Sequence, residues 1–385
     1  MKILMVEWNG MGQKKIKKAF TSEGHNLVYF PLDIDKDNYY HNPEFARAFM
    51  EALRQETPDI VFSVDFFPVI SRECQKEKIR YVSWVYDSPH IMLYYETVLN
   101  SCNHIYIFDR TLYLQLCSSG VSTVHYMPLA ADADSPDDLE KRGELPFLYD
   151  ISFVGSLYLE GEDYYGAMET RLPDYANGYL DGLINAQMKI HGYNFIEESL
   201  GPVINDLDKA LHISIPAESM QTRENFYAQC IINRRITAIE RMDILDVIAQ
   251  RHKIDLFTHY KGFTLPNLEN HGKVDYDTEM PRVMKQSKIN LNITLRSIQS
   301  GIPLRAFDIM GEGGFLLSNF QAEFLDYFVP GKDFVYYESK EDLLQKIDYY
   351  LAHEDERMEI AKNGHEKIAA GHTYRHRVRE MLERV

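Results

Sequence analysis

The stretch IPLRAFDIMGEGGFLLSN, residues 302–319, places Arg305 and Asp308 about one helical turn apart between two apolar runs. At the start of a helix, a guanidinium can bind a diphosphate together with backbone N–H groups and the positive end of the helix dipole. A carboxylate in the same turn can accept hydrogen bonds from both hydroxyls of a ribose. The two residues could instead form a salt bridge at the helix start, and the residue types leave both interpretations open.

Other polar residues in this half of the chain follow or end predicted strands. Gly155 and Ser156 follow the run YDISFV, where backbone N–H groups could face a phosphate or simply form a turn. His259 and Tyr260 end the run IDLFTHY, where a tyrosine ring can stack on a base and an imidazole can donate to a phosphate oxygen. A lone histidine is more often structural. Asn292, in the run INLNITL, completes the expected substrate-binding set.

The N-terminal half offers candidates for a general base. Asp65, Asp87 and His90 follow two strand-like runs. Asp87 or His90 could take a proton from an acceptor hydroxyl if burial brings the pKa near the working pH. Asp87 could equally cap a helix that starts at the following Ser-Pro. Gly10 and Gly12 resemble half of a dinucleotide-binding fingerprint, which predicts either a phosphate contact or a tight turn that an acceptor can approach.

The elements that must position these residues are short apolar runs alternating with helical patterns. From residue 1 to about 130 they predict a doubly wound parallel sheet. The expected strands there are KILMVEW, HNLVYFP, DIVFSVD, RYVSWVY, HIYIFD and STVHYMP. After the polar connection ADSPDDLEKRGELP the alternation restarts, with YDISFVGS, IDLFTHY, KVDY, INLNITL, GGFLLSN and DFVYY as expected strands.

We therefore expect an α/β protein of two Rossmann-like domains, residues 1–145 and 146–372, whose strand ends face a shared ligand cleft. Residues 158 to about 250 have mostly helical periodicity, which predicts a helical insertion in the second domain. The C-terminal helical sequence, residues 373–385, could pack back on the first domain. Apolar surface on the insertion could pair subunits, so a homo-oligomer stays open.

Composition excludes several classes of protein. A formal charge of -17 opposes binding to nucleic acid, because phosphate contacts need clustered cations. The four cysteines have no zinc-like spacing, and no segment has the run of about 18 apolar residues that spans a membrane. We expect a soluble, cytoplasmic protein. No Asp-x-Asp run is flanked by apolar strand residues: the run at 33–35 follows the second expected strand and the run at 132–134 lies in the connection, so no metal site is predicted.

Several longer runs resemble a known family. The segments KVDYDTEMPRVMKQSKINLNITL, PLRAFDIMGEGGFLLSN, FVPGKDFVYYESKEDLLQKIDYYL and AKNGHEKIAAGHTYRHRV are similar to the C-terminal domain of group 1 glycosyltransferases, specifically the spore-maturation CgeB-like family. DIVFSVD, YVSWVYDSPH, HIYIFDR and YMPLAAD, followed by ISFVGSLY, resemble its N-terminal half. The resemblance implies a GT-B fold with the nucleotide-sugar donor held mainly by the C-terminal domain and the acceptor by the N-terminal domain.

The resemblance also implies roles for single residues. Asp308 occupies the place of an acidic residue, more often Glu, that binds the donor ribose. Ser300 stands where retaining relatives carry a further Glu, so a retaining mechanism does not follow from the motif. Arg305, the turn at Gly155 and Ser156, and His259 would stabilise the leaving diphosphate without a metal ion.

The leading hypothesis is thus a metal-independent glycosyltransferase that uses a nucleotide-diphosphate sugar. Its acceptor could be a polysaccharide, a protein hydroxyl or a small molecule, and no further cofactor is expected. A non-hydrolysing nucleotide-sugar epimerase would share the architecture but need no acceptor. A non-catalytic nucleotide-sugar binding protein is the third alternative, which the missing Glu favours.

Overall fold

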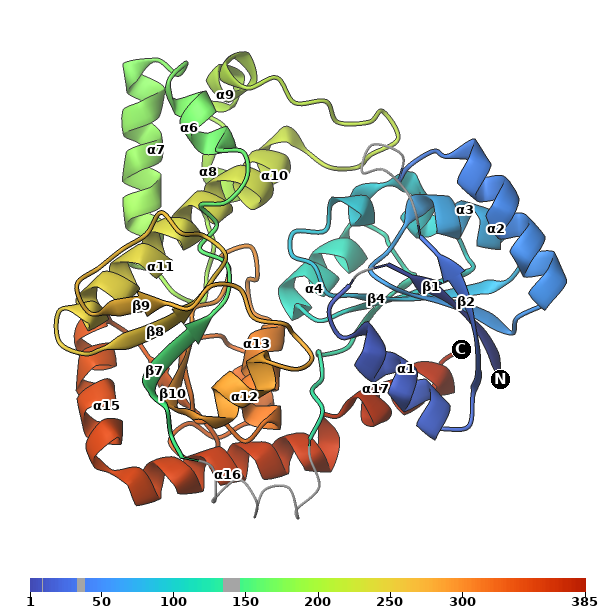
Figure 1. Cartoon of the computed structure of the whole chain (residues 1–385). Coiled ribbons are helices and arrows are strands. Elements are labelled where there is room, and N and C mark those ends of the chain that lie inside the picture. The colour runs from blue at the N-terminus through green and yellow to red at the C-terminus, as the bar shows by residue number, and fades with distance from the viewer. Residues whose placement is uncertain (9, 33–38, 134–145) are drawn as a thin grey trace. The chain divides into compact units, whose positions relative to one another are not determined.

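A computed structural model describes residues 1–8, 10–32, 39–133 and 146–385 (Figure 1). Contacts divide the chain into two compact units. Unit 1 contains Met1–Ala130, Ile215–Gln221 and His372–Val385, and unit 2 contains Ala131–Ser214 and Thr222–Gly371. The expected domain boundary at residue 145 lies outside the described residues, as do Asp33, Asp35 and Asp134 of the Asp-x-Asp runs at 33–35 and 132–134.

Unit 1 is built on a parallel six-stranded sheet with the order β2-β1-β3-β4-β5-β6. Its strands are β1 (Lys2–Glu7), β2 (Asn26–Pro31), β3 (Ile60–Val64), β4 (Arg80–Val85), β5 (Asn103–Ile107) and β6 (Val124–Tyr126). Its helices are α1 (Gln13–Ser22), α2 (Pro43–Glu56), α3 (Pro68–Glu77), α4 (Arg110–Ser118) and α17 (Tyr374–Glu383), with 3-10 turns η2 (Ile91–Tyr94) and η3 (Glu96–Leu99).

Local sequence explains these elements. Every residue of β3 is buried, as expected for a central parallel strand covered on both faces. Helix α2 begins where Asn42 accepts a hydrogen bond from the Phe45 N–H, with Pro43 in its first turn. In Figure 1, α1 and α17 lie on one face of the sheet and α2 and α3 on the other. The C-terminal helix therefore completes unit 1.

Unit 2 contains a second parallel sheet, with the order β12-β11-β10-β7-β8-β9. Its strands are β7 (Tyr149–Val154), β8 (Ile254–Phe257), β9 (Leu268–Asn270), β10 (Ser287–Asn292), β11 (Leu316–Asn319) and β12 (Val335–Tyr337). Its helices are α6 (Tyr164–Glu169), α7 (Asp174–Gln187), α8 (Ile196–Ser199), α9 (Ile204–Ala210), α10 (Arg223–Phe226), α11 (Asn233–Ala249), α12 (Met280–Lys285), α13 (Leu304–Gly311), α14 (Phe324–Tyr327), α15 (Lys340–Ala352) and α16 (Glu354–Gly371), with a π-helical turn η4 (Tyr227–Ile232).

One predicted strand is wrong. KVDY, residues 273–276, is not a strand, and the edge strand is instead β9 at Leu268–Asn270. The carboxylate of Asp275 accepts hydrogen bonds from the backbone N–H groups of Asp277 and Thr278, which folds the segment into a turn. This local competition by an Asp side chain overrides the alternating pattern.

The insertion between β7 and β8 is helical and has its own hydrophobic core. Residues of α6 to α9, η4 and the first turn of α11 form this core, separate from the core in which α11 and α15 cover the sheet. The short segment Ile215–Gln221 nevertheless belongs to unit 1, where the Glu96 N–H donates to the Glu218 carbonyl. No helix in the described ranges is long and apolar enough to span a bilayer.

Helix α13 packs closely against neighbouring residues at Gly311. A Cβ at this position would lie 2.4 Å from the Asp132 carbonyl oxygen and 2.5 Å from the Ala131 Cβ, so the backbone would have to move. Gly311→Ala should lower the free energy of unfolding by about 1–3 kcal/mol. The control is Gly182→Ala in α7, which meets no atom within 4 Å and should be neutral or slightly stabilising. Thermal unfolding of both variants measures the difference; equal melting temperatures would contradict it.

Candidate active site

The sheet of unit 2 reverses its winding between β7 and β10, where ligands of open α/β sheets bind. Arg241 of α11 bridges this point: its guanidinium donates to the carbonyl of Ser156, after β7, and to that of Ile293, after β10. The side chain is 8% exposed, and no carboxylate in the described residues forms an ion pair with it. Burial lowers the pKa of Arg241, and the charge of Arg305 adds to that effect. The negative charges of Glu160 and Glu240 oppose this lowering, and the two neighbouring guanidinium groups favour an anionic ligand.

Arg305 and Asp308 lie on α13, which begins after Pro303. The Arg305 Nη1 lies 3.7 Å from Asp308 Oδ2, so the pair forms the salt bridge that the spacing allowed. Asp308 is almost fully buried, and its Oδ1 accepts a hydrogen bond from the Tyr276 hydroxyl at 2.9 Å. Arg305 also contacts the Met280 sulfur. With Arg241, two guanidinium groups and one carboxylate lie near the switch point.

The turn after β7, for which a phosphate contact and a simple turn were both predicted, is held by hydrogen bonds within unit 2. The Gly155 N–H donates to the Phe257 carbonyl at 3.1 Å, so it is already bonded. The Ser156 hydroxyl donates to Glu160 Oε2 at 2.6 Å and accepts from the Tyr158 N–H. Burial opposes ionisation of Glu160, but hydrogen bonds from Ser156 and Leu157 outweigh it and lower the pKa. This turn is a rigid support for the neighbouring Arg241.

The other predicted residues of unit 2 are placed as follows. His259 follows β8, with its Nε2 3.8 Å from Glu160 Oε1 and about half of its side chain exposed. Tyr260 packs against the sheet core and lines a pocket described below. Asn292 is buried, and its amide nitrogen donates to Thr294 and Ser318 hydroxyls at 3.1 and 2.9 Å. Asn292 thus ties the ends of β10 and β11 together.

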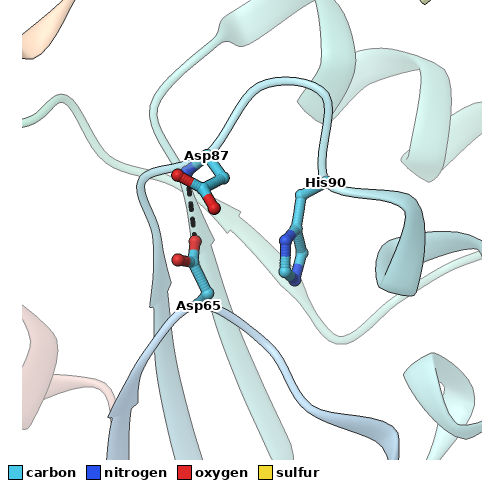
Figure 2. Close-up of side chains that lie close together, drawn as sticks. All are labelled: Asp65, Asp87 and His90. Carbon is cyan, nitrogen blue, oxygen red and sulfur yellow. Dashed lines mark hydrogen bonds between the residues drawn. The ribbon is translucent and has the colours of Figure 1, made fainter. Parts of the chain in front are cut away.

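Unit 1 brings Asp65 and Asp87 together after β3 and β4 (Figure 2). Asp65 has a φ of 61°, uncommon for a residue other than glycine. Its buried Oδ1 accepts hydrogen bonds from the backbone N–H groups of Tyr86 and Asp87, at 2.8 and 3.1 Å. The Asp87 side chain is exposed. Burial raises the pKa of Asp65 to about 6, and the negative charge of Asp87 adds to the rise. Asp65 thus orients the loop that presents Asp87.

His90 lies beside this pair but faces the backbone. Its Nε2 is 2.8 Å from the Phe66 carbonyl and 3.2 Å from the Phe66 N–H, and the ring is buried. Which contact is the hydrogen bond depends on the tautomer. Either way the imidazole fixes the loop after β3, so Asp87 is the more accessible of the two predicted bases.

Gly10 and Gly12 form the entry to α1. Gly12, the residue preceding that helix, has a φ of 79°, and a Cβ there would approach the Tyr374 hydroxyl at 3.0 Å. The Gly10 N–H donates to the Trp8 carbonyl at 2.7 Å. The Trp8 indole donates to the Val64 carbonyl, which joins the ends of β1 and β3 at the switch point of this sheet. The glycines therefore make a tight turn, one of their two predicted roles.

Among the described residues, two groups of side chains have the chemistry of metal ligands. Asp65, Asp87 and His90 offer atoms within 4.8 Å of one another, but backbone groups already engage Asp65 Oδ1 and the His90 Nε2. In the group of Asp255, Glu269 and His271, the Lys253 ammonium lies 2.8 Å from Glu269 and 3.5 Å from Asp255. A lysine there supplies the positive charge that a metal ion would bring.

The raised pKa of Asp65 predicts a pH dependence of stability. Between the unfolded pKa near 4 and the folded pKa of about 6, the folded protein binds more protons, so this stabilisation is lost as the pH rises to about 6. In the wild type, this group should lower the free energy of unfolding by about 2 kcal/mol between pH 4.5 and 7.5, and Asp65→Asn should lack that part of the decrease. Asn also tolerates a positive φ. Urea unfolding at both pH values tests this, with the exposed Asp59→Asn at the other end of β3 as control; identical pH dependence in wild type and Asp65→Asn would refute the raised pKa.

Arg241 is the functional candidate that the sequence reasoning missed. It lies far from any strand end in the sequence, within the helical run of the insertion. A signal was present, because Arg241 falls on the same helical face as the buried Leu245 and Ile248. A charge in an apolar stripe needs a partner, and here the partners are the two carbonyls at the switch point.

Part of the chain matches a known family, and its fold matches solved structures. Residues 237–383 match the family model described as glycosyl transferase-like. No curated protein sequence matches the chain. Sucrose-phosphate synthase from Thermosynechococcus elongatus is 11% identical with a TM-score of 0.54, over 100% of this chain and 98% of that one. Anabaena HepE, solved with UDP and glucose, is 10% identical with a TM-score of 0.51 over 100% of both chains.

A third solved structure is an alpha-glucosyltransferase in complex with UDP and a 13-mer DNA containing an HMU base. It is 11% identical with a TM-score of 0.54, over 100% of this chain and 98% of that one. At identities this low, the structural matches show the fold alone. The two parallel-sheet units of this chain form a GT-B fold. The family match contains Arg241, Arg305 and Asp308. Together, the comparisons support a GT-B glycosyltransferase.

Proposed function

We propose that this protein transfers a sugar from a nucleotide-diphosphate sugar to an acceptor hydroxyl, without a metal ion. The observation that carries the proposal is the pair of guanidinium groups, Arg241 and Arg305, beside the buried carboxylate of Asp308 at the switch point of unit 2. Two cations suit a diphosphate, and a carboxylate on the same helix suits the hydroxyls of a ribose.

On the donor side, the departing diphosphate gains negative charge as the glycosidic bond breaks. Arg305 in the first turn of α13 would stabilise that charge as a preorganised donor, and the buried charge of Arg241, whose Nη groups bond to backbone carbonyls, would add positive potential. Asp308, held by the Tyr276 hydroxyl, would accept hydrogen bonds from the ribose. Because the arginines supply the positive potential, we propose that no divalent cation is required.

On the acceptor side, Asp87 is the proposed general base. Its backbone N–H is held by Asp65, so the exposed carboxylate extends from a fixed loop. It would take the proton of the acceptor hydroxyl as the oxygen attacks the anomeric carbon in an inverting reaction. In a retaining reaction, the departing phosphate could take that proton instead. His90 and Asp65 are then positioning residues.

The proposal also names a donor class and a group within the family. The two neighbours solved with UDP favour UDP-sugars as the first donors to test. The sequence motifs favour the CgeB-like group of the family, and a polysaccharide, a protein or a small molecule could serve as acceptor.

The test is incubation of the purified chain with UDP-, GDP-, dTDP- and ADP-sugars in EDTA, with and without a panel of hydroxyl acceptors. A glycosyltransferase should release one nucleoside diphosphate and form a glycoside. Formation of an epimeric nucleotide sugar without acceptor would indicate an epimerase. Binding of a nucleotide sugar without turnover across the acceptor panel would favour a non-catalytic binding protein.

A further inference from the structure

A separate pocket of about 200 Å³ opens in unit 2 where the helical insertion meets the sheet. One wall is the chain after β7 and the start of α6, and the other is formed by η4 and α11. The residues that matter for its chemistry are Tyr158, Tyr164, Tyr260, Glu160, Arg234 and Arg235. For scale, a cavity of about 150 Å³ can hold a six-membered ring such as benzene. This pocket therefore has room for one substituted six-membered ring.

The backbone around the pocket is unusual on both walls. Tyr158 has a φ of 58°, a conformation that a bulky side chain rarely adopts. On the opposite wall, Cys230 and Ile231 belong to the π-helical turn η4. Strained residues and π-helical turns persist where surrounding structure imposes them, and they are frequent at functional sites.

The arginines of the pocket contact aromatic rings and a backbone carbonyl. Arg234 lies over the Tyr158 ring at 5.5 Å, and Arg235 lies over the Tyr165 ring at 5.3 Å. Arg234 also donates to the Glu160 carbonyl at 2.6 Å, and neither arginine forms an ion pair with a carboxylate of the described residues. The pocket thus offers guanidinium and phenol donors next to carboxylate acceptors, with tyrosine rings among its lining residues.

The pocket adjoins the predicted diphosphate site. The Tyr158 ring also lies 4.8 Å from the Arg241 guanidinium, on which the donor site depends. Glu160 lines the pocket, and its carboxylate accepts a hydrogen bond from the Ser156 hydroxyl in the turn after β7. The Tyr158 ring thus separates a ligand in the pocket from the Arg241 guanidinium.

We propose that this pocket binds one monosaccharide unit of the acceptor, an inference that rests on the proposed function. Sugar hydroxyls both donate and accept, which matches neighbouring guanidinium, phenol and carboxylate groups. The C–H face of a sugar ring matches the tyrosine rings, and a small number of polar groups on an aromatic wall is typical of ligand pockets. Most of the lining precedes residue 237 and so lies outside the family match, which suits a role in reading an acceptor particular to this chain.

The test is saturation-transfer NMR on the full chain with methyl glycosides of glucose, galactose, mannose and N-acetylglucosamine. At least one should bind the wild type, and Tyr164→Ala and Arg234→Gln should weaken it about threefold to tenfold. Both side chains are exposed, so the fold should tolerate the changes. Tyr175→Ala, an exposed tyrosine on α7 outside the pocket, is the matched control and should bind as the wild type does.

Three results would overturn the inference: no binding of any methyl glycoside, binding that the two pocket variants leave unchanged, or binding of UMP that Tyr164→Ala abolishes. The last would assign the pocket to the donor base. Stabilisation by UDP, GDP, dTDP and ADP is measured in parallel on wild type. If one nucleotide stabilises the chain while all glycosides fail, only the acceptor pocket is refuted; if none stabilises it, the proposed function fails as well.

Discussion

Replacing Arg305 with Ala should lower kcat about 10²- to 10³-fold, the usual loss when one preorganised donor to developing charge is removed. Arg305 lies in the first turn of α13, where helix dipole and guanidinium act on the same diphosphate. Because charge grows on the leaving group only as the bond breaks, the loss in kcat should exceed the rise in donor KM. Steady-state kinetics with the donor found by the nucleotide-sugar panel measure both.

Two further variants make this prediction specific. Arg305→Lys keeps the charge next to Asp308 but loses the planar fork, so it should recover part of kcat. Arg282→Ala removes an exposed arginine of α12 and should be neutral. An equal loss of binding in ground and transition states, seen as a higher KM with unchanged kcat, would contradict a role on developing charge.

Replacing Asp87 with Asn should lower the rate of transfer about 10²- to 10⁴-fold if the reaction inverts configuration, because a positioned base contributes that much. The substitution keeps the backbone N–H that Asp65 accepts, so the loop should keep its form. Donor binding in unit 2 should be unaffected. Initial rates of glycoside formation under saturating donor test the prediction.

The outcome also reports on the stereochemical course. Asp59→Asn, at the opposite end of β3, should keep wild-type activity as a control for lost surface charge. If Asp87→Asn retains most of the wild-type rate, Asp87 is not the base, and proton transfer to the departing phosphate becomes the better account. Analysis of the anomeric configuration of the product then distinguishes the two mechanisms.

The sheets could be predicted from sequence because their strands are buried apolar runs. DIVFSVD contains β3, all of whose residues are buried, and INLNITL contains most of β10. Strand β9 could not be found this way, because it has three residues, none of them fully buried. The Asp275 turn shows the same limit, since one side chain that bonds to its own backbone outweighs a short alternating pattern.

The candidate residues were predicted from two kinds of local signal. Arg305 and Asp308 were proposed from their spacing at a helix start, and Asp87 from its place after a strand, since parallel strands bring their carboxyl ends to one edge of a sheet. The partners of each group could not be read from sequence: the Gly155 N–H bonds to β8, and Asn292 bonds to hydroxyls across the strands. Arg241 reaches the switch point from a helix more than eighty residues beyond Ser156, a contact that only the fold creates.

The most direct test of a donor site on α13 is isothermal titration calorimetry of UDP, GDP, dTDP and ADP in EDTA, with wild type and Asp308→Asn. The account predicts that one nucleotide binds the wild type without a metal ion. It also predicts binding about 10- to 100-fold weaker in Asp308→Asn, because charged hydrogen bonds to the ribose are lost. Binding that Asp308→Asn leaves unchanged, or no binding of any of the four, would contradict the assignment of Arg305 and Asp308 to a nucleotide-sugar donor.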